Sequence, residues 1–102
     1  MAAPEAWSLR PAAEAALTEI WRYSAVTWGP QQADSYVDAL FVAFDLLADF
    51  PQMARERSEF TPLVRIHPSG TQLVIYRTTD QGIDIIRLLH AHQNLFAYLQ
   101  DN

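Results

Sequence analysis

Hydrophobic residues recur at spacings of three and four along two long stretches in the first half of the chain. The first stretch follows Pro11, a residue that is tolerated in the first turn of a helix. Its inward positions are Ala13, Leu17, Ile20, Trp21, Ser24 and Trp28. The second stretch runs from Gln31 to just before Pro51. Its inward positions are Ala33, Tyr36, Val37, Leu40, Phe44, Leu47 and Ala48. Because only Gly29 and Pro30 separate the two, the pattern predicts an antiparallel helical hairpin.

The second half of the chain alternates short apolar runs with turn-forming residues. The runs are residues 63–67, 73–77 and 83–89, and the turns between them are Pro68-Ser69-Gly70 and Thr79-Asp80-Gln81-Gly82. Runs of β-branched and aliphatic residues with such punctuation predict an antiparallel meander of three strands. In the last run, strict alternation places Ile83, Ile85, Arg87 and Leu89 on one face and Asp84, Ile86, Leu88 and His90 on the other.

Three shorter segments complete the expected order of elements. Residues 7–9 form an extended segment, residues 51–62 form an exposed loop, and residues 94–100 form a short terminal helix. The expected order is therefore β-α-α-β-β-β-α, an α+β fold in which the helical hairpin packs on one face of a mainly antiparallel sheet. With 102 residues, the chain is expected to form a single domain over residues 1–102.

The composition narrows the class of protein. Hydrophobic residues make up 50% and charged residues 19%, as in a globular protein. The absence of cysteine excludes disulfides, thiolate metal ligands and thiol nucleophiles. The N-terminus lacks the basic start and apolar core of a signal peptide, and the apolar stretch at residues 39–48 is shorter than the ~20 residues that a membrane span needs. We therefore expect a soluble, cytoplasmic protein.

The charges indicate which partners the chain suits. The formal net charge is -5, which argues against a broad nonspecific grip on nucleic acid. Every basic side chain is arginine, so recognition of an anion would use planar, bidentate guanidinium groups. Arg65, Arg77 and Arg87 lie on three successive predicted strands and could converge on one surface of the sheet.

Several segments, in order along the chain, carry a resemblance to a known family. They are residues 9–17 (LRPAAEAAL), 20–23 (IWRY), Trp28-Gly29, 46–48 (LLA) with Pro51, Tyr76-Arg77 and 83–90 (IDIIRLLH). Over roughly residues 7–94, the chain resembles the ParE branch of the RelE/ParE toxin superfamily. Arg10 departs from the family pattern, because a small N-capping residue is usual there and arginine caps a helix poorly. We therefore expect a frayed start to the first helix.

The resemblance implies the toxin of a type II toxin–antitoxin pair. Such a toxin would bind DNA gyrase, or a related type II topoisomerase, and trap it on cleaved DNA, with no catalysis of its own and no cofactor. A ParD-like antitoxin would neutralise it by laying a largely disordered segment over the toxin, which folds as it binds. The expected assembly is a hetero-oligomer of toxin and antitoxin, with no membrane partner.

Two sets of residues are candidates for contact with these partners. The target-contact candidates are Arg65, Arg77, Arg87 and His90. The antitoxin-binding candidates are Tyr23, Val26, Phe41 and Val42. The residues of the second set fall off the main apolar stripe of the helices, so some of them could form an exposed apolar surface. The residues expected in the core are Trp21, Trp28, Tyr36 and Phe44.

Two other functions stay open from the sequence. One is that of the RelE-like branch, a ribosome-dependent mRNA endoribonuclease. The catalytic groups of that branch could be imitated here by Arg65, Arg87 and His90. The acidic net charge argues against this chemistry on a polyanionic substrate. The other is a toxin fold that only binds an antitoxin. No metal site is expected, since His90 and His92 lack further ligands at a suitable spacing.

Overall fold

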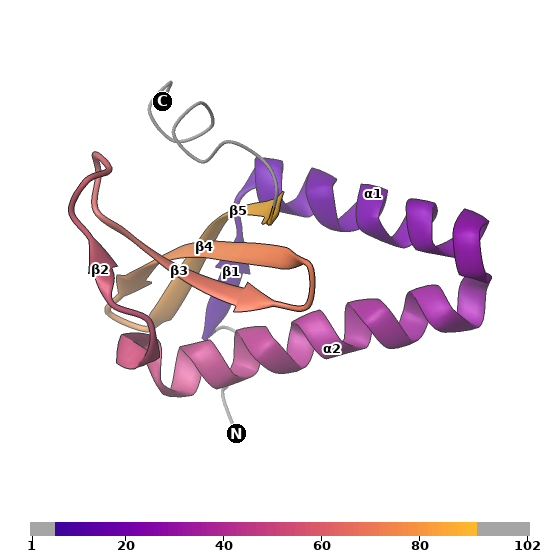
Figure 1. Cartoon of the computed structure of the whole chain (residues 1–102). Helices are drawn as coiled ribbons and strands as arrows, with labels where there is room; N and C mark the ends of the chain where they lie inside the picture. Colours follow the sequence, from indigo (N-terminus) through magenta and orange to yellow (C-terminus); the bar gives the residue numbers. More distant parts are fainter. Residues whose placement is uncertain (1–5, 92–102) are drawn as a thin grey trace.

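The computed structural model describes residues 6–91, which form a helical hairpin packed against one sheet (Figure 1). The helices are α1 (Pro11–Trp28) and α2 (Pro30–Asp49), followed by a short 3₁₀ helix, η1 (Pro51–Met53). The strands are β1 (Trp7–Leu9), β2 (Glu56–Arg57), β3 (Val64–Ser69), β4 (Gln72–Thr79) and β5 (Gly82–His90). Their order in the sheet is β1-β5-β4-β3-β2, and only β1 and β5 pair in parallel. The predicted α+β class, with its hairpin on a mainly antiparallel sheet, is confirmed.

Part of the prediction lies outside the described residues. It comprises the terminal helix at residues 94–100, together with His92. Within residues 6–91, no helix is both long enough and apolar enough to cross a membrane.

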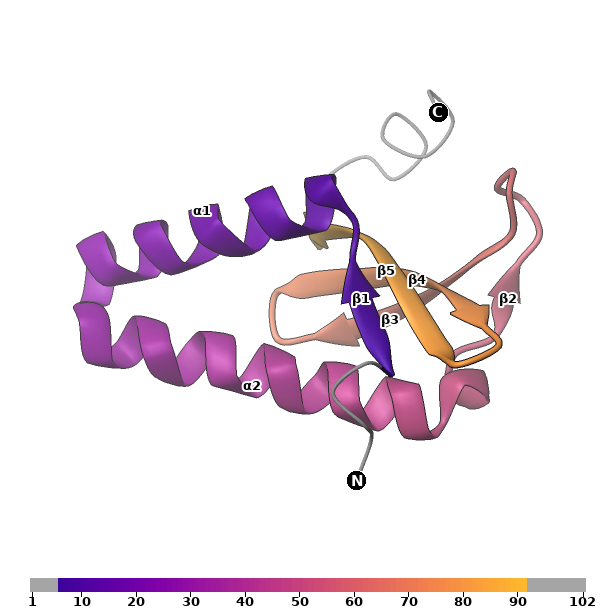
Figure 2. The same cartoon turned by 180° about the vertical axis from the view of Figure 1, so that it is seen from behind.

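Gly29 alone joins the two helices. Its amide donates a hydrogen bond to the Ala25 carbonyl at 2.9 Å, and its carbonyl accepts one from the Ala33 amide at 3.1 Å. Its φ of 98° lies in a region that glycine adopts at little cost. Pro30 follows in the first turn of α2, where a backbone N–H would have no hydrogen-bond acceptor within the helix. The helices therefore diverge from a tight tip, which projects beyond the sheet in Figures 1 and 2.

The main core lies between the hairpin and one face of the sheet. Its buried members are Ala13, Leu40, Phe44 and Leu47 from the helices, Ala54 from the segment after η1, and Val74, Tyr76, Ile83, Ile85 and Leu88 from the sheet. The predicted inward stripe of α2 is thus confirmed. The prediction that Trp21 and Trp28 belong to the core is wrong, since these residues are 38% and 63% exposed. The end of α1 projects beyond the sheet, so no strand covers it (Figure 1).

A β-bulge changes which residues of β5 face the helices. In the pairing of β4 with β5, Ile75 lies opposite Arg87. The next residue of β4, Tyr76, lies opposite Ile85, so Ile86 is an extra residue on β5. The strict alternation predicted for this strand is therefore wrong beyond Ile85. The residues that face the helices are Ile83, Ile85 and Leu88, and those on the opposite face are Ile86, Arg87 and Leu89. We call this second face the open face; its small core consists of Phe60, Val64, Ile75 and Leu89.

The segment expected as a loop, residues 51–62, contains η1 and β2, which corrects the expected order of elements. Two side chains of the sheet hold this segment in place. Arg65 donates from Nη1 to the Ala54 carbonyl at 2.5 Å, and the Tyr76 hydroxyl donates to the Pro51 carbonyl at 2.8 Å. Burial raises the pKa of the Tyr76 phenol, which keeps it a donor. These contacts are long-range, so local periodicity could not predict them.

β3 extends through Pro68 and Ser69, which the sequence pattern had placed in a turn. β2 pairs only with the first residues of β3. The remainder of β3 is therefore a sheet edge, where proline is tolerated because no neighbouring strand needs its N–H.

Candidate partner-binding surfaces

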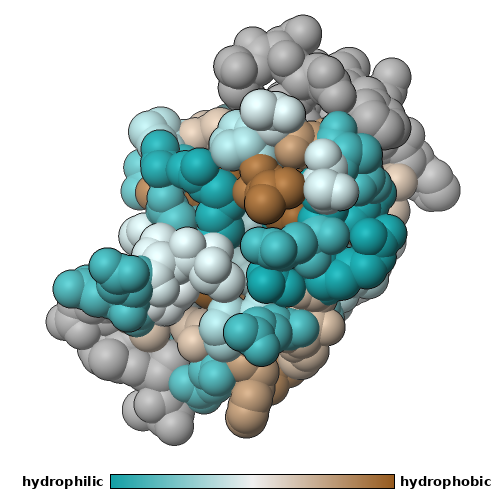
Figure 3. Space-filling view, turned by 90° about the vertical axis from the view of Figure 1, so that its left-hand side faces the viewer, coloured by the Kyte–Doolittle hydropathy of each residue, from teal (hydrophilic) through white to brown (hydrophobic). Residues whose placement is uncertain are grey.

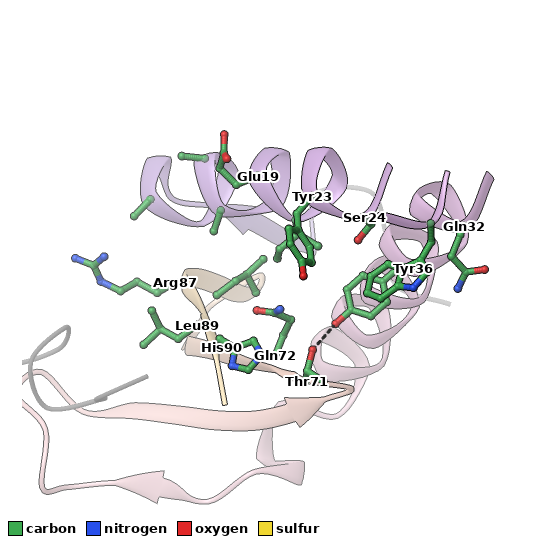
Figure 4. Close-up of a pocket in the computed structure, with 16 residues that line it drawn as sticks. Glu19, Tyr23, Ser24, Gln32, Tyr36, Thr71, Gln72, Arg87, Leu89 and His90 are labelled. Atoms are coloured by element: carbon green, nitrogen blue, oxygen red, sulfur yellow. Dashed lines mark hydrogen bonds between the residues drawn. The ribbon is translucent and has the colours of Figure 1, made fainter. Parts of the chain in front are cut away.

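A large groove lies between the two helices and the end of the sheet (Figure 4). Its volume is about 830 Å³. Its main lining residues are Ala12, Ala15, Ala16, Ile20 and Tyr23 of α1, Tyr36 of α2, and Gln72 with residues 87–90 of the sheet. We call it the hairpin groove.

Small side chains on α1 create this groove. Ala12, Ala15 and Ala16 lie on one face of the helix, where larger side chains would fill the space. Tyr23 points from α1 toward Tyr36, whose hydroxyl is hydrogen-bonded to Thr71 Oγ1 at 3.1 Å (Figure 4). A mainly apolar groove with aromatic side chains suits the apolar face of a helix from another protein.

The structure separates the four antitoxin-binding candidates. Tyr23 is 65% exposed and lines the hairpin groove. Val26 and Val42 are 84% and 67% exposed, and neither lines the groove. Phe41 packs against the main core, with its ring stacked on Trp7 at 5.7 Å between centroids. Three of the four candidates are therefore exposed, as expected of a partner surface, whereas α2 turns Phe41 inward. A role in antitoxin binding stays a prediction for each.

A smaller groove of about 330 Å³ lies on the open face. Arg10, Arg77 and Arg87 line it, beside the apolar side chains of Phe60 and Ile86. Arg77 and Arg87 share this face because they lie on β4 and β5 in register with the open-face core. Arg10 reaches the groove from the position before α1. We call it the arginine groove.

The start of α1 is tied to the sheet. Arg10 provides no side-chain cap, as expected, but its amide donates to the Ile85 carbonyl at 2.9 Å. The helix is thus anchored by backbone pairing where the sequence predicted fraying. This contact also fixes the position from which the Arg10 side chain reaches the arginine groove.

Asp84 holds the Arg10 side chain beside this groove. Its carboxylate accepts from the Ser8 hydroxyl at 2.9 Å and from Arg10 Nε at 2.6 Å. Burial alone would raise the pKa of Asp84, but these hydrogen bonds and the charges of Arg10 and Arg77 outweigh burial and hold the pKa below its usual range. The Arg10 side chain remains 52% exposed, so it still offers donors to a further anion.

Arg65 belongs to a different face of the sheet from the other two candidate arginines. It is opposite Tyr76 in the pairing of β3 with β4, so it shares the face that the helices cover. Its side chain is only 14% exposed and lies 3.8 Å from Glu56, in addition to its bond to the Ala54 carbonyl. Arg77 and Arg87 therefore share the open face, whereas Arg65 meets only Arg77, in the lining of a small pocket of about 130 Å³.

His90 is exposed and lines the hairpin groove, away from the arginine groove. The residues that would imitate a ribonuclease are thereby divided, because Arg65 lines a different pocket from Arg87 and His90. Residues 6–91 hold no group of three or more histidine, cysteine or carboxylate side chains that could bind a metal ion.

Sequence reasoning missed Arg10 and Tyr36 as site residues. The sequence pattern identifies Arg10 only as a poor helix cap. Tyr36 was assigned to the core, yet its hydroxyl end reaches the hairpin groove. The small residues on one face of α1 were the available signal for that groove.

The chain matches known proteins over most of its length. The family model described as ParE toxin of type II toxin-antitoxin system, parDE, matches residues 8–95. The chain is 38% identical over 88 residues to Toxin ParE1 of Mycobacterium tuberculosis, which is 85% of this chain and 90% of that protein. It is 34% identical over 87 residues to Toxin ParE1 of Caulobacter vibrioides, again 85% of this chain and 90% of that protein.

The fold is also shared with a solved structure. The structure described as the chromosomal ParDE TA system from P. aeruginosa superimposes with a TM-score of 0.70 at 21% sequence identity. The alignment covers 82% of this chain and 92% of the other. The resemblance that the sequence carried is therefore confirmed, and this chain belongs to the ParE toxin family of type II toxin–antitoxin systems.

Proposed function

We propose that this ParE-like toxin inhibits DNA gyrase, or a related type II topoisomerase, by binding it and stalling it on cleaved DNA. The observation that carries the proposal is the family match over residues 8–95, with 38% identity to Toxin ParE1. The toxin acts as one domain, by binding and not by catalysis, and it needs no cofactor. It acts in the cytoplasm, where the topoisomerase is bound to DNA.

A ParD-like antitoxin neutralises the toxin through the hairpin groove. Ile20, Tyr23 and Tyr36 supply an apolar and aromatic lining that an amphipathic helix would cover. Partly exposed aromatic side chains in a groove are typical anchors of binding free energy. The solved relative is described as a ParDE system, which supports an antitoxin as the partner.

The target is contacted from the open face. Of the four candidates for target contact, Arg77 and Arg87 lie together in the arginine groove. Arg65 is engaged by the Ala54 carbonyl, and His90 lies in the hairpin groove. We therefore assign target contact first to Arg77 and Arg87.

Purified gyrase tests this proposal. The wild-type chain should inhibit supercoiling of plasmid DNA and increase the amount of cleaved DNA held by the enzyme. The double variant Arg77→Gln/Arg87→Gln should inhibit at least ~10-fold less well, the effect of about one lost charged contact. Arg55→Gln, an exposed arginine outside both grooves, is the matched control. Unchanged supercoiling at any toxin concentration would exclude gyrase as the target.

A further inference from the structure

The charges of the described residues are separated in space. The helices carry Glu14, Glu19, Asp34, Asp38, Asp45 and Asp49 against Arg22, a net negative charge. The other described residues carry Arg10, Arg55, Arg57, Arg65, Arg77 and Arg87 against Glu56, Glu59, Asp80 and Asp84, a net positive charge. Figure 3 views the end of the molecule opposite the hairpin tip, where hydrophilic side chains surround one hydrophobic area. An acidic segment of a partner is therefore repelled by the helices and attracted by the sheet.

The two grooves are adjacent. Ala12 and Arg87 line both of them, so a chain lying in the hairpin groove can continue into the arginine groove. In Figure 4, Arg87 lies at the end of the hairpin groove farthest from Gln32, where α1 begins. A single partner segment can thus contact an apolar surface first and three guanidinium groups next.

We propose that the arginine groove is a second antitoxin subsite, which binds a carboxylate-bearing stretch that follows the apolar segment held in the hairpin groove. This inference rests on the proposed neutralisation by an antitoxin. Arg10, Arg77 and Arg87 pair with the carboxylates, and adjacent apolar side chains of the stretch pack on Phe60 and Ile86. The free toxin already shows one such pair, because Asp84 accepts from Arg10 at 2.6 Å.

The groove favours a carboxylate of a protein over a phosphate of nucleic acid. Apolar residues such as Phe60, Pro62 and Ile86 form much of its lining, and a phosphodiester backbone offers them nothing to bury. The net charge of -5 also repels a polyanion at long range. A peptide with alternating acidic and apolar side chains matches both parts of the lining.

This second subsite gives neutralisation a physical mechanism. The proposed target contacts, Arg77 and Arg87, are also the residues that the acidic stretch would cover. Antitoxin and target then compete for the same guanidinium groups, so a bound antitoxin keeps the toxin from its target.

The test measures, by titration calorimetry, the affinity of the full-length toxin for a ParD-like antitoxin, whose gene is sought beside that of the toxin. Arg10→Gln and Arg77→Gln should each weaken binding by about 10-fold, the loss of one charge-assisted contact. Their affinity should also depend less on salt than that of the wild type. Arg55→Gln is the matched control and should leave the affinity unchanged. Circular dichroism confirms that each variant is folded.

A second arm replaces the acidic residues of the antitoxin stretch by their amides. The amide variant of the antitoxin should bind the wild-type toxin about as weakly as the unmodified antitoxin binds the arginine variants. When an arginine variant is combined with the amide variant, the affinity should fall no further than with either change alone. Arginine variants that bind the unmodified antitoxin as tightly as Arg55→Gln does would overturn the inference. If the wild-type toxin binds no antitoxin at all, the proposed neutralisation fails before this inference is reached.

A third arm uses a short DNA duplex as the probe at physiological salt. No binding is expected from the wild-type toxin. If the wild-type toxin binds the duplex and Arg10→Gln and Arg77→Gln abolish that binding, the groove binds a phosphate backbone. This result would overturn the assignment to a carboxylate.

Discussion

Asp84 connects three elements through one carboxylate. β5 carries it, Ser8 of β1 donates to it at 2.9 Å, and Arg10 before α1 donates to it at 2.6 Å. Arg10 and Asp84 are 74 positions apart in the sequence. The same ion pair therefore holds the N-terminal segment to the sheet and shapes the edge of the arginine groove.

The pKa of Asp84 makes part of the stability depend on pH. The folded pKa is lowered, so the ionised carboxylate stabilises the fold above its unfolded pKa, about 4, and this contribution is lost as the pH falls through the folded pKa. Asp84→Asn should lower the free energy of unfolding by about 1 kcal/mol at pH 7. The difference from the wild type should shrink below about pH 4. Urea denaturation across this range measures it.

Asp80→Asn is the control for this prediction. Asp80 lies exposed in the turn between β4 and β5, so its removal should change stability little at any pH. If Asp84→Asn lowers the free energy of unfolding by the same amount from neutral to acid pH, packing is responsible and the charge of Asp84 is not.

The arginines show what a sequence does and does not reveal at this scale. Arg65, Arg77 and Arg87 have the same side chain and all lie on predicted strands. The register of β3 against β4 and the bulge in β5 place Arg65 on the helix-covered face and the other two on the open face. Both depend on pairing between distant residues, which periodicity does not encode.

At the scale of elements, β1 lies unusually close to the start of β5. The Ile83 amide donates to the Ala6 carbonyl at 2.8 Å. A Cβ atom at Gly82, whose φ is 153°, would lie only 1.8 Å from that carbonyl oxygen. Glycine is therefore required for β1 to add to the sheet as a parallel strand.

Gly82→Ala should displace β1 and lower the free energy of unfolding by about 3 kcal/mol. Gly70→Ala is the matched control. Its φ of 61° is also positive, but its nearest neighbour, the Tyr36 hydroxyl, lies 3.4 Å from the added Cβ. Gly70→Ala should therefore lower the free energy of unfolding by only about 1 kcal/mol. Equal losses in urea denaturation would contradict the close approach of β1 and β5.

The hairpin groove can be blocked without disturbing the core. Ala15 is exposed and lines the groove, so Ala15→Trp should fill it and weaken antitoxin binding at least ~10-fold. The variant should still inhibit the target, because the arginine groove is unchanged. Ala39→Trp, on an exposed position of α2 outside the groove, is the control for adding a tryptophan. Full neutralisation of Ala15→Trp by the antitoxin would exclude the hairpin groove as its site.

The helices were predictable and parts of the sheet were not. Leu40, Phe44 and Leu47 keep a helical period over the whole of α2, and a local period needs no knowledge of distant partners. β2 consists of two residues with no apolar pattern, and its pairing depends on where β3 lies. The two grooves could not be predicted either, since each combines residues from both halves of the chain.

At the scale of the whole molecule, the two grooves lie on a protein whose charges are divided between hairpin and sheet. The hairpin side offers an apolar groove on helices of net negative charge, and the sheet side offers guanidinium groups. This arrangement suits two partners, one that covers both grooves and one that needs only the open face. The antitoxin and the target are therefore expected to compete for the toxin.

Induced expression in a bacterial host without the antitoxin shows whether the toxin damages DNA, with DNA double-strand breaks and messenger RNA cleavage scored in the same cells. We expect breaks with intact transcripts, and co-expression of the antitoxin should abolish the breaks. Cleaved transcripts with an intact chromosome would contradict this expectation and place the chain with the ribonuclease branch. Unimpaired growth would contradict it as well, and would leave a toxin fold that only binds an antitoxin.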